Sequence, residues 1–361
     1  MGELLLMKKK FSFLVMSYHT INFFRPIIKE LIRRGNEVQI LAIYELPYGA
    51  KEDKFNTHRV QWQKFELSRL EKFNPDTVVI FNGFFRPIHA ASQYIAQRWT
   101  TLYAEVAWFT QNEYIYIDKD IHGNSAIAQW SDYYHHQSKG KIDWEKGNEV
   151  LNDLWEKYEP GPKPVELEDG MLNVVVPLQL ERDTSILYAS HTFKDMGSLV
   201  GFIYKACKES LHKVNLIVKT HPKLKTDDLE EHFKPDQFPG IKFVKDTPST
   251  MNDYAAHCDA VIGINSTSII EAHVHERHVY QMGSNVFKRM PDRADIKEIH
   301  AFLDRVAAGE EARYIEQTRS NLLYLLANQI DYKKPAPWVY DKLLSPDPRA
   351  FRPRPPEATY E

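Results

Sequence analysis

Short apolar runs alternate with amphipathic segments along most of the chain. Residues 23–35 place isoleucine and leucine at helical spacing and end at Gly35, which predicts a helix with a C-terminal stop. A second helix is expected near 88–98. Because strands that alternate with helices are typical of βαβ units, this pattern predicts a parallel sheet. The strands expected in this first block are residues 11–16, 37–43, 77–83 and 101–108.

A second alternating block follows the segment EPGPKP, residues 159–164. Its prolines interrupt helices and central strands, so the segment predicts a linker. We therefore expect an α/β fold with two Rossmann-like domains, residues 1–165 and 166–330, whose parallel sheets face a central cleft. Residues 331–361 are expected to form a tail along the surface. The elements expected in the second block are strands at 173–180, 214–220, 241–244, 260–264 and 278–283, and helices near 195–211, 226–233, 249–257, 266–275, 296–306 and 311–330.

The length, net charge and composition of the chain argue against several classes of function. A chain of 361 residues is long enough for two domains, and a formal net charge of −3 provides no general basic field for nucleic acid. The start does not resemble a signal peptide, and no stretch approaches the roughly 20 apolar residues of a membrane helix. We expect a soluble cytoplasmic protein with two reduced, buried cysteines. Its aromatic content of 12% is compatible with peripheral association with a membrane.

Polar, chemically capable side chains follow three apolar runs of the second block. They are Gln179 and Asp183 after the first run, Lys219 and His221 after the second, and Asn265, Ser266 and Thr267 after the third. In open α/β sheets, ligands bind beyond the carboxyl ends of the strands. The three strand ends therefore predict one site, and its imidazole, ammonium and hydroxyl groups suit an anionic, phosphate-bearing ligand.

The segment Asn265-Ser266-Thr267 is expected to begin a helix. One interpretation is that Ser or Thr only caps the free backbone N–H groups. The other is that these N–H groups and the positive end of the helix dipole hold a phosphate. Glu271, one turn further along, favours the second interpretation because its carboxylate could accept hydrogen bonds from ribose hydroxyls.

Two carboxylates are candidates for catalysis. Asp183 suits a nucleophile or an acid/base group, although capping of its own turn is an equal alternative. Glu105 lies near the end of an apolar strand, where a carboxylate is costly to bury unless it is paired or functional. Carboxylates on either side of a sugar bond are the usual equipment for glycosyl transfer.

No metal site and no resident cofactor are expected. His273, His275 and His278 form H-x-H-x-x-H, but in a helix His273 and His275 point to different faces. The chain also lacks a G-x-G-x-x-G fingerprint and a P-loop motif, so neither a dinucleotide site nor a P-loop is favoured.

Several of these segments together resemble a known family. VPLQLERDTS, KTHPK and GINSTSIIEA resemble the Q-x-x-x-D-[ST], H-P and N-S-[ST]-x-x-x-E signatures of bacterial capsule polysaccharide and lipopolysaccharide β-Kdo transferases. Residues 105–124 resemble the E-x-G-x-x-P…D-x-x-G-x-N segment of that family, with departures at Ala107 and Thr110. The likeness covers roughly residues 75–285, and FNGFFRP (81–87) resembles the N-terminal strand and loop of that family.

The resemblance implies a GT-B fold with an acceptor-side N-terminal domain and a donor-binding C-terminal domain. The donor would be CMP-activated 3-deoxy-manno-octulosonic acid (Kdo), transferred with retention to a cell-surface glycan or glycolipid. Asp183 would be the nucleophile and Glu105 the acid/base or acceptor-side carboxylate. His221 would contact the donor phosphate and assist departure of CMP. The residues implied in donor binding are Gln179, Lys219, Asn265, Ser266, Thr267 and Glu271, and those on the acceptor side are Asn82, Gly83 and Asn124. Such an enzyme would be cytoplasmic or peripheral at the inner face of the bacterial inner membrane.

Three alternatives stay open at this point. A CDP-glycerol or CDP-ribitol phosphotransferase of the teichoic-acid type has a similar lysine-flanked H-P, but D-Y-S-S in place of N-S-T. A sugar-nucleotide epimerase shares the two-domain fold. A non-catalytic protein that binds nucleotides or glycans belongs to a different class. Donor turnover by an Asp183 variant discriminates among them, since a binding protein has no turnover to lose.

Overall fold

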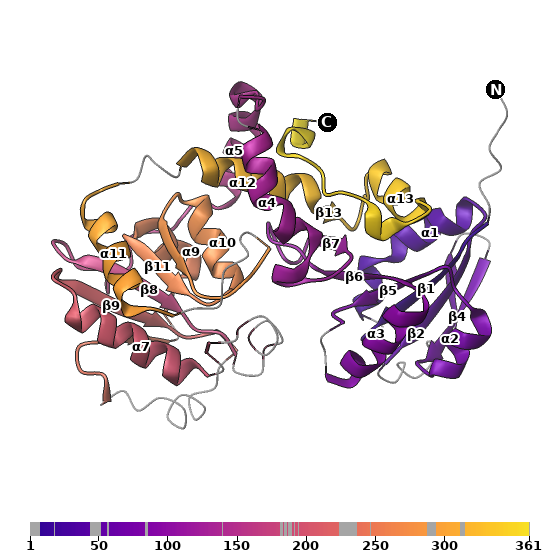
Figure 1. Cartoon of the computed structure of the whole chain (residues 1–361), viewed down its shortest axis with the longest axis horizontal. Coiled ribbons are helices and arrows are strands. Elements are labelled where there is room, and N and C mark those ends of the chain that lie inside the picture. Colours follow the sequence, from indigo (N-terminus) through magenta and orange to yellow (C-terminus); the bar gives the residue numbers. More distant parts are fainter. Residues whose placement is uncertain are drawn as a thin grey trace. The chain divides into compact units, whose positions relative to one another are not determined.

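The computed structural model describes residues 8–360 except for 18, 44–51, 56–57, 84–85, 139, 181–182, 184–185, 187–189, 191, 194, 224–236, 246, 287–293 and 311–314. The chain forms two compact units, each containing a sheet covered by helices on both faces (Figure 1). The first unit is Met1–Ile121 with Asn328–Pro353, and the second is His122–Ala327 with Arg354–Glu361. This confirms the expected α/β class with two largely parallel sheets.

The sheet of the first unit has the strand order β13-β7-β6-β5-β1-β2-β4-β3. Its central strands run parallel, whereas β7 pairs antiparallel with both β6 and β13, and β3 pairs antiparallel with β4. The strands are β1 (Lys10–Val15), β2 (Glu37–Ala42), β3 (Glu52–Phe55), β4 (His58–Lys64), β5 (Thr77–Phe81), β6 (Thr100–Val106), β7 (Tyr114–Asp118) and β13 (Ile330–Asp331).

Helices cover both faces of this sheet because its central strands are apolar on both sides. On one face, Phe11 and Phe13 pack with Ile27 of α1 and Leu343 of α13. On the other face, Leu14 packs with residues of α2 and α3. The helices are η1 (His19–Phe23), α1 (Arg25–Arg33), α2 (Leu67–Phe73), α3 (Arg86–Arg98), α13 (Pro337–Leu344) and η5 (Pro348–Ala350).

The sheet of the second unit is parallel throughout, with the order β10-β9-β8-β11-β12. Residues of α7 and α11 pack on one face, and residues of α9 and α10 pack on the other. The strands are β8 (Leu172–Pro177), β9 (Val214–Lys219), β10 (Lys242–Val244), β11 (Ala260–Gly263) and β12 (His278–Gln281). The helices are η2 (His122–Asn124), α4 (Ala126–Ser138), α5 (Trp144–Lys157), α7 (Met196–Glu209), α9 (Met251–His257), α10 (Thr267–Val274), α11 (Ile296–Ala307), α12 (Ile315–Asn328) and η6 (Pro356–Tyr360). The helix expected near 226–233 lies outside the described residues.

The boundary between the units differs from the one expected at the proline-rich linker. Helices α4 and α5 precede that linker, yet they pack with the second unit. The hydroxyl of Tyr324 in α12 donates to the carbonyl of Ile127 in α4 at 2.7 Å, and the Trp155 indole of α5 donates to the carbonyl of Val274 in α10 at 2.8 Å. The chain therefore passes from the first unit to the second at Ile121, well before the prolines.

The expected C-terminal tail is also an integral part of the fold. Val339 and Leu343 of α13 are buried in the core of the first unit, and β13 adds an edge strand to its sheet. The Lys342 ammonium is buried as well and donates to the carbonyl of Ile117 at 2.5 Å. Apolar positions at helical spacing within 337–344 could have indicated this helix.

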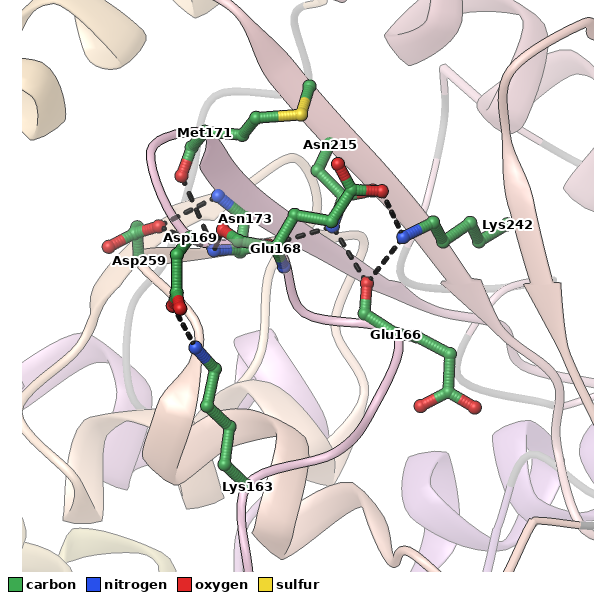
Figure 2. A network of polar contacts seen from close by, with 9 residues as sticks. All are labelled: Lys163, Glu166, Glu168, Asp169, Met171, Asn173, Asn215, Lys242 and Asp259. Carbon is green, nitrogen blue, oxygen red and sulfur yellow. Dashed lines mark hydrogen bonds and ion pairs between the residues drawn. The ribbon is translucent and has the colours of Figure 1, made fainter.

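The segment directly after the linker, residues 166–173, is fixed to the edge of the second sheet at which the strands begin, by a group of polar contacts that we call the linker network (Figure 2). The side-chain oxygen of buried Asn173 accepts from the Glu168 backbone at 2.8 Å and from the Asn215 amide at 2.8 Å. The Asn215 amide also donates to the carbonyl of Glu166 at 2.9 Å, and the Lys242 ammonium donates to the same carbonyl at 2.8 Å. These contacts tie residues 166–173 to β8, β9 and β10.

Candidate active site

The strand order of the second unit brings the three predicted strand ends together. Central β8 leads to Gln179 and Asp183, and its neighbours β9 and β11 lead to His221 and to Asn265. Because all strands of this sheet run parallel, these loops emerge at the same edge. The opposite edge carries the linker network, so the two groups of polar residues are separate.

A buried amide pair joins two of these loops. The Gln179 side-chain amide donates to the Asn265 side-chain oxygen at 3.0 Å, and both residues are less than 8% exposed. The Asn265 amide in turn approaches the carbonyl of Ser284 at 3.4 Å. Gln179 and Asn265 thus hold the ends of β8 and β11 in a fixed arrangement, which is a structural task in addition to any contact with a ligand.

Asp183 lies in a hydrogen-bonded turn beyond β8. Its N–H donates to the carbonyl of Leu180 at 2.8 Å, and its own carbonyl accepts from Ile186 at 3.1 Å. The half-buried carboxylate is close enough to act electrostatically on two imidazoles, those of His221 and His122. The turn therefore holds a carboxylate at the edge where ligands of such sheets bind.

His221 is arranged as a neutral hydrogen-bond donor. Its Nδ1 accepts from the backbone N–H of Lys223 at 3.1 Å, so the neutral ring carries its hydrogen on Nε2. Burial lowers the pKa of His221, the charge of Lys223 lowers it further, and Asp183 acts in the opposite direction. The imidazole is therefore largely uncharged at neutral pH and offers Nε2–H to a ligand oxygen.

The start of α10 forms the third side of the site. Ser266 caps the helix, since its hydroxyl accepts from the N–H of Ser268 at 3.2 Å. Glu271 lies one turn further along the helix and is half-buried. Burial raises the pKa of Glu271 to about 7, so this carboxyl group is close to half protonated at neutral pH. Both the capping and the ligand interpretations remain compatible with this geometry.

The side chain of Lys219 lies on the α9 face of the sheet and not among the other residues expected to bind the donor. Its ammonium is 5.4 Å from the ring centroid of Tyr254 in α9, and the Tyr254 hydroxyl donates to Glu166 at 2.6 Å. Side chains alternate along a strand, and Lys219 therefore shares its face with Ile217, which packs against α9. The cation is held over an aromatic ring on that face of the sheet.

The sequence matches a family model described as capsule polysaccharide biosynthesis protein over residues 82–328, which is well over half of the chain. The chain belongs to this family. The matched span contains every residue predicted for the site, from Asn82 to Glu271. No curated protein matches the chain by sequence.

Solved structures support the fold of this capsule polysaccharide biosynthesis protein. It is similar to KpsC from Thermosulfurimonas dismutans, a β-Kdo 2,7 transferase, at 14% identity, with a TM-score of 0.52 over 81% of this chain and 90% of that one. It is also similar to the β-Kdo 2,4 transferase of the same organism's KpsC, at 14% identity, with a TM-score of 0.50 over 81% of this chain and 89% of that one. At this level of identity the likeness establishes the GT-B-like fold.

The residues predicted for the acceptor side and for acid/base catalysis are divided between the units. Asn82 and Gly83 follow β5 of the first unit, where a side chain at position 83 would collide with Tyr103. Glu105 belongs to β6 of the same unit, is 9% exposed and accepts from the Val106 N–H at 2.9 Å. Asn124 belongs to the second unit and is exposed.

Sequence reasoning did not single out His122, whose pKa is affected by the charge of Asp183. It begins η2, and its φ of 53° lies in the left-handed region that non-glycine residues seldom adopt. Burial lowers the pKa of His122 to about 4, and the nearby Asp183 opposes that shift. The signal that could have found it is its place directly before Gly123 in a segment that already resembled a family motif.

The described histidines and cysteines serve other contacts than metal binding. Among the described residues, no group of three or more His, Cys, Asp or Glu side chains is arranged to hold a metal ion. His275 instead contacts the Asn252 side-chain oxygen at 2.7 Å. Cys258 is buried and Cys207 half-buried, and burial raises the pKa of each thiol to about 12.

In the described part of the chain, no helix is long and apolar enough to cross a membrane.

Proposed function

We propose that this protein is a glycosyltransferase that moves a Kdo-type acidic sugar from a CMP-activated donor to a cell-surface glycan or glycolipid, with retention of configuration. The observation that carries the proposal is the place of Asp183, which lies in a hydrogen-bonded turn beyond β8, at the edge of the second sheet where the neighbouring strands lead to His221 and Asn265. Membership of the capsule polysaccharide biosynthesis family supports it, since that biosynthesis requires transfer of activated sugars.

The charges of the donor suit the groups around Asp183. A CMP-linked acidic sugar carries a phosphodiester and a carboxylate, and the N–H groups at the start of α10 favour such anions. The Nε2–H of His221 can donate to an oxygen of the phosphate. Glu271 would accept hydrogen bonds from ribose hydroxyls in its ionised form. The Gln179–Asn265 pair joins the loops that follow β8 and β11, and Lys219 contributes positive charge on the α9 face of the sheet.

The proposed chemistry proceeds by two displacements at the anomeric carbon of the sugar. A carboxylate oxygen of Asp183 forms a bond to this carbon while the bond to the phosphate oxygen breaks, and the electron pair leaves with CMP. The acceptor hydroxyl oxygen then displaces Asp183 and loses its proton to a base, for which we propose Glu105. The products are the glycoside, CMP and a proton, and two inversions give retention. Burial of Glu105 agrees with a functional carboxylate.

The decisive experiment measures CMP release and sugar transfer by Asp183→Asn. We expect turnover of CMP-Kdo to fall about 1,000-fold or more, while donor affinity changes only a few-fold, because the variant keeps the shape of the side chain. Asp195→Asn is the matched control. Asp195 is in the same unit, where it caps α7 by accepting from Ser198 at 2.7 Å, and asparagine caps equally well.

Assays of the wild-type protein with CMP-Kdo and with CDP-glycerol as donors separate this function from its alternatives. A wild-type protein that ignores CMP-Kdo and consumes CDP-glycerol would be a phosphotransferase of the teichoic-acid type. A protein that binds CMP-Kdo without turning over either donor would be a binding protein. Either result would overturn the proposal, as would full activity of Asp183→Asn.

A further inference from the structure

We propose that the exposed face of α4 is a binding surface for the saccharide chain of the acceptor, formed by the rings of Tyr133 and Trp130 and the polar side chains beside them. The choice of a saccharide rests on the proposed function, but binding to this face can be measured without turnover. The whole surface belongs to the second unit, which also contains Asp183 and the ends of β8 and β11.

One face of α4 is exposed along most of its length. The exposed positions are Gln129, Tyr133, His136 and Gln137. Because residues three or four apart lie on the same face of a helix, these side chains form one stripe. From Gln129 to Gln137 the stripe is about 12 Å long, since an α-helix rises about 1.5 Å per residue. That is the length of a short oligosaccharide rather than of a single sugar.

Tyr133 lies in the middle of the stripe and is 43% exposed. The Trp130 ring meets the Tyr133 ring edge to face, with 4.8 Å between the ring centroids and an interplanar angle of 87°. Tyr134 lies beside both rings, 5.9 Å from Trp130 and 5.4 Å from Tyr133. Aromatic contacts of this kind favour one relative orientation of the rings. The exposed ring therefore offers a fixed surface on which the apolar C–H face of a sugar can stack.

The inner side of α4 supports these rings. The Tyr134 ring packs on that of Tyr324 in α12, with 5.3 Å between the centroids. Tyr324 is 1% exposed, and its hydroxyl donates to the carbonyl of Ile127 in α4 at 2.7 Å. Because the aromatic cluster is already packed in this way, a ligand that binds to it loses little affinity to the ordering of side chains.

The stripe begins next to the strand ends of the candidate active site. η2 directly precedes α4, and a Cβ atom added to Gly123 of η2 would collide with Ser284. The Ser284 carbonyl accepts from the Asn265 amide that follows β11. The side-chain amide of Gln129 donates to the carbonyl of exposed Asn124 at 2.9 Å, which joins the first turn of α4 to η2. A saccharide chain that lies along the stripe would thus lead away from the edge where the donor is proposed to bind.

The residue types of the stripe suit a carbohydrate better than a membrane. α4 contains no lysine or arginine, whereas helices that bind anionic lipid surfaces carry such residues on their polar face. The amides of Gln129 and Gln137 both donate and accept hydrogen bonds, as does the imidazole of His136 in its neutral form. Aromatic rings flanked by such groups match the C–H and O–H groups that a sugar ring presents side by side.

The first experiment measures binding to the full chain by NMR of the tryptophan indole groups, with a β-linked Kdo tetrasaccharide as the probe and no donor present. We expect the Trp130 signal to shift on titration, and Trp130→Phe identifies this signal. Trp155, whose indole donates to the Val274 carbonyl at 2.8 Å, is the internal reference. Tyr133→Leu should weaken binding about 3- to 10-fold, because it removes the ring, and Tyr133→Phe, which keeps the ring, should not.

The second experiment separates the acceptor from the donor. We expect Tyr133→Leu to raise the KM for the tetrasaccharide about 3- to 10-fold and to leave hydrolysis of CMP-Kdo without an acceptor within about twofold of wild type. Leucine is favourable in helices and the position is exposed, so the variant should fold. Tyr94→Leu is the matched control, because Tyr94 is a 36% exposed tyrosine in α3 of the first unit.

Each contrary result has a distinct meaning. A Trp130 signal that the tetrasaccharide does not move, or an affinity that Tyr133→Leu leaves unchanged, would overturn the inference. Equal losses in CMP-Kdo hydrolysis and in use of the tetrasaccharide would do the same. Binding of phosphatidylglycerol vesicles that Tyr133→Leu abolishes, without any effect of the tetrasaccharide on Trp130, would identify a membrane contact instead. A wild-type protein that binds the tetrasaccharide at α4 but does not turn over CMP-Kdo would refute the proposed function and support this inference.

Discussion

Asn265 illustrates how one side chain serves both the fold and the site. Its oxygen accepts from the Gln179 amide in a buried environment, and its amide reaches the Ser284 carbonyl. Removing either member of such a pair leaves a buried polar group without its partner, at a cost of about 1–3 kcal/mol. A loss of activity in an Asn265 variant would therefore not by itself identify a ligand contact, whereas Asp183 and His221 offer a cleaner test.

At the same scale, Glu271 makes stability depend on pH. Its folded pKa of about 7 lies above the usual 4.5, so the folded state binds this proton more tightly than the unfolded state. The associated stability is complete below about pH 4.5 and is lost as pH rises through 7. We expect Glu271→Gln to become more stable relative to wild type between pH 5 and pH 8, by at most about 3 kcal/mol.

Urea unfolding of wild type and Glu271→Gln at both pH values measures this difference. Glu149→Gln, an exposed change in α5 of the same unit, is the control. A stability difference between wild type and Glu271→Gln that is the same at pH 5 and pH 8 would count against the raised pKa.

At the scale of elements, the linker network ties the segment after the proline-rich linker to the starts of β8 and β9. We expect Asn173→Leu to destabilise the second unit by about 2 kcal/mol or more, because the Glu168 N–H and the Asn215 amide lose a buried partner (Figure 2). Chemical denaturation followed by circular dichroism gives this quantity.

A second variant within the same network provides the comparison. Lys163 pairs with Asp169 at 2.5 Å, but both side chains are largely exposed. Lys163→Met should therefore cost no more than about 1 kcal/mol. Equal losses for Lys163→Met and Asn173→Leu would show that the buried amides do not carry the network.

At the scale of the whole molecule, the C-terminal residues complete the first unit. We expect Leu343→Ala to cost about 2–5 kcal/mol, since this side chain is fully buried against α1 and β1. Hydrogen exchange should increase in β1 and α1 and stay unchanged in β8 and β9, which belong to the other unit. The adjacent Leu344→Ala, at a half-buried position, should have a smaller effect.

Faster exchange in β8 and β9 of Leu343→Ala would contradict the division of the chain into these two units. That division also bears on the design of fragments. A fragment of residues 166–330 lacks α4 and therefore the carbonyl of Ile127 that the buried Tyr324 hydroxyl contacts. Residues 122–327 are the better starting point for a donor-binding fragment.

The sequence by itself determined the two α/β blocks, most of their strands and the strand ends that carry Gln179, Asp183, His221 and Asn265. These features are local, because apolar runs and the polar residues that end them are read from neighbouring positions. Once the strands are parallel, their carboxyl ends must lie at one edge.

Only the tertiary structure decided the features that depend on distant residues. It assigned α4 and α5 to the second unit and α13 to the first, because these helices bury their apolar faces against segments far away in the sequence. It also placed the Lys219 ammonium over Tyr254. Such pairings follow from packing between segments, and the local pattern of apolar and polar residues contains no record of them.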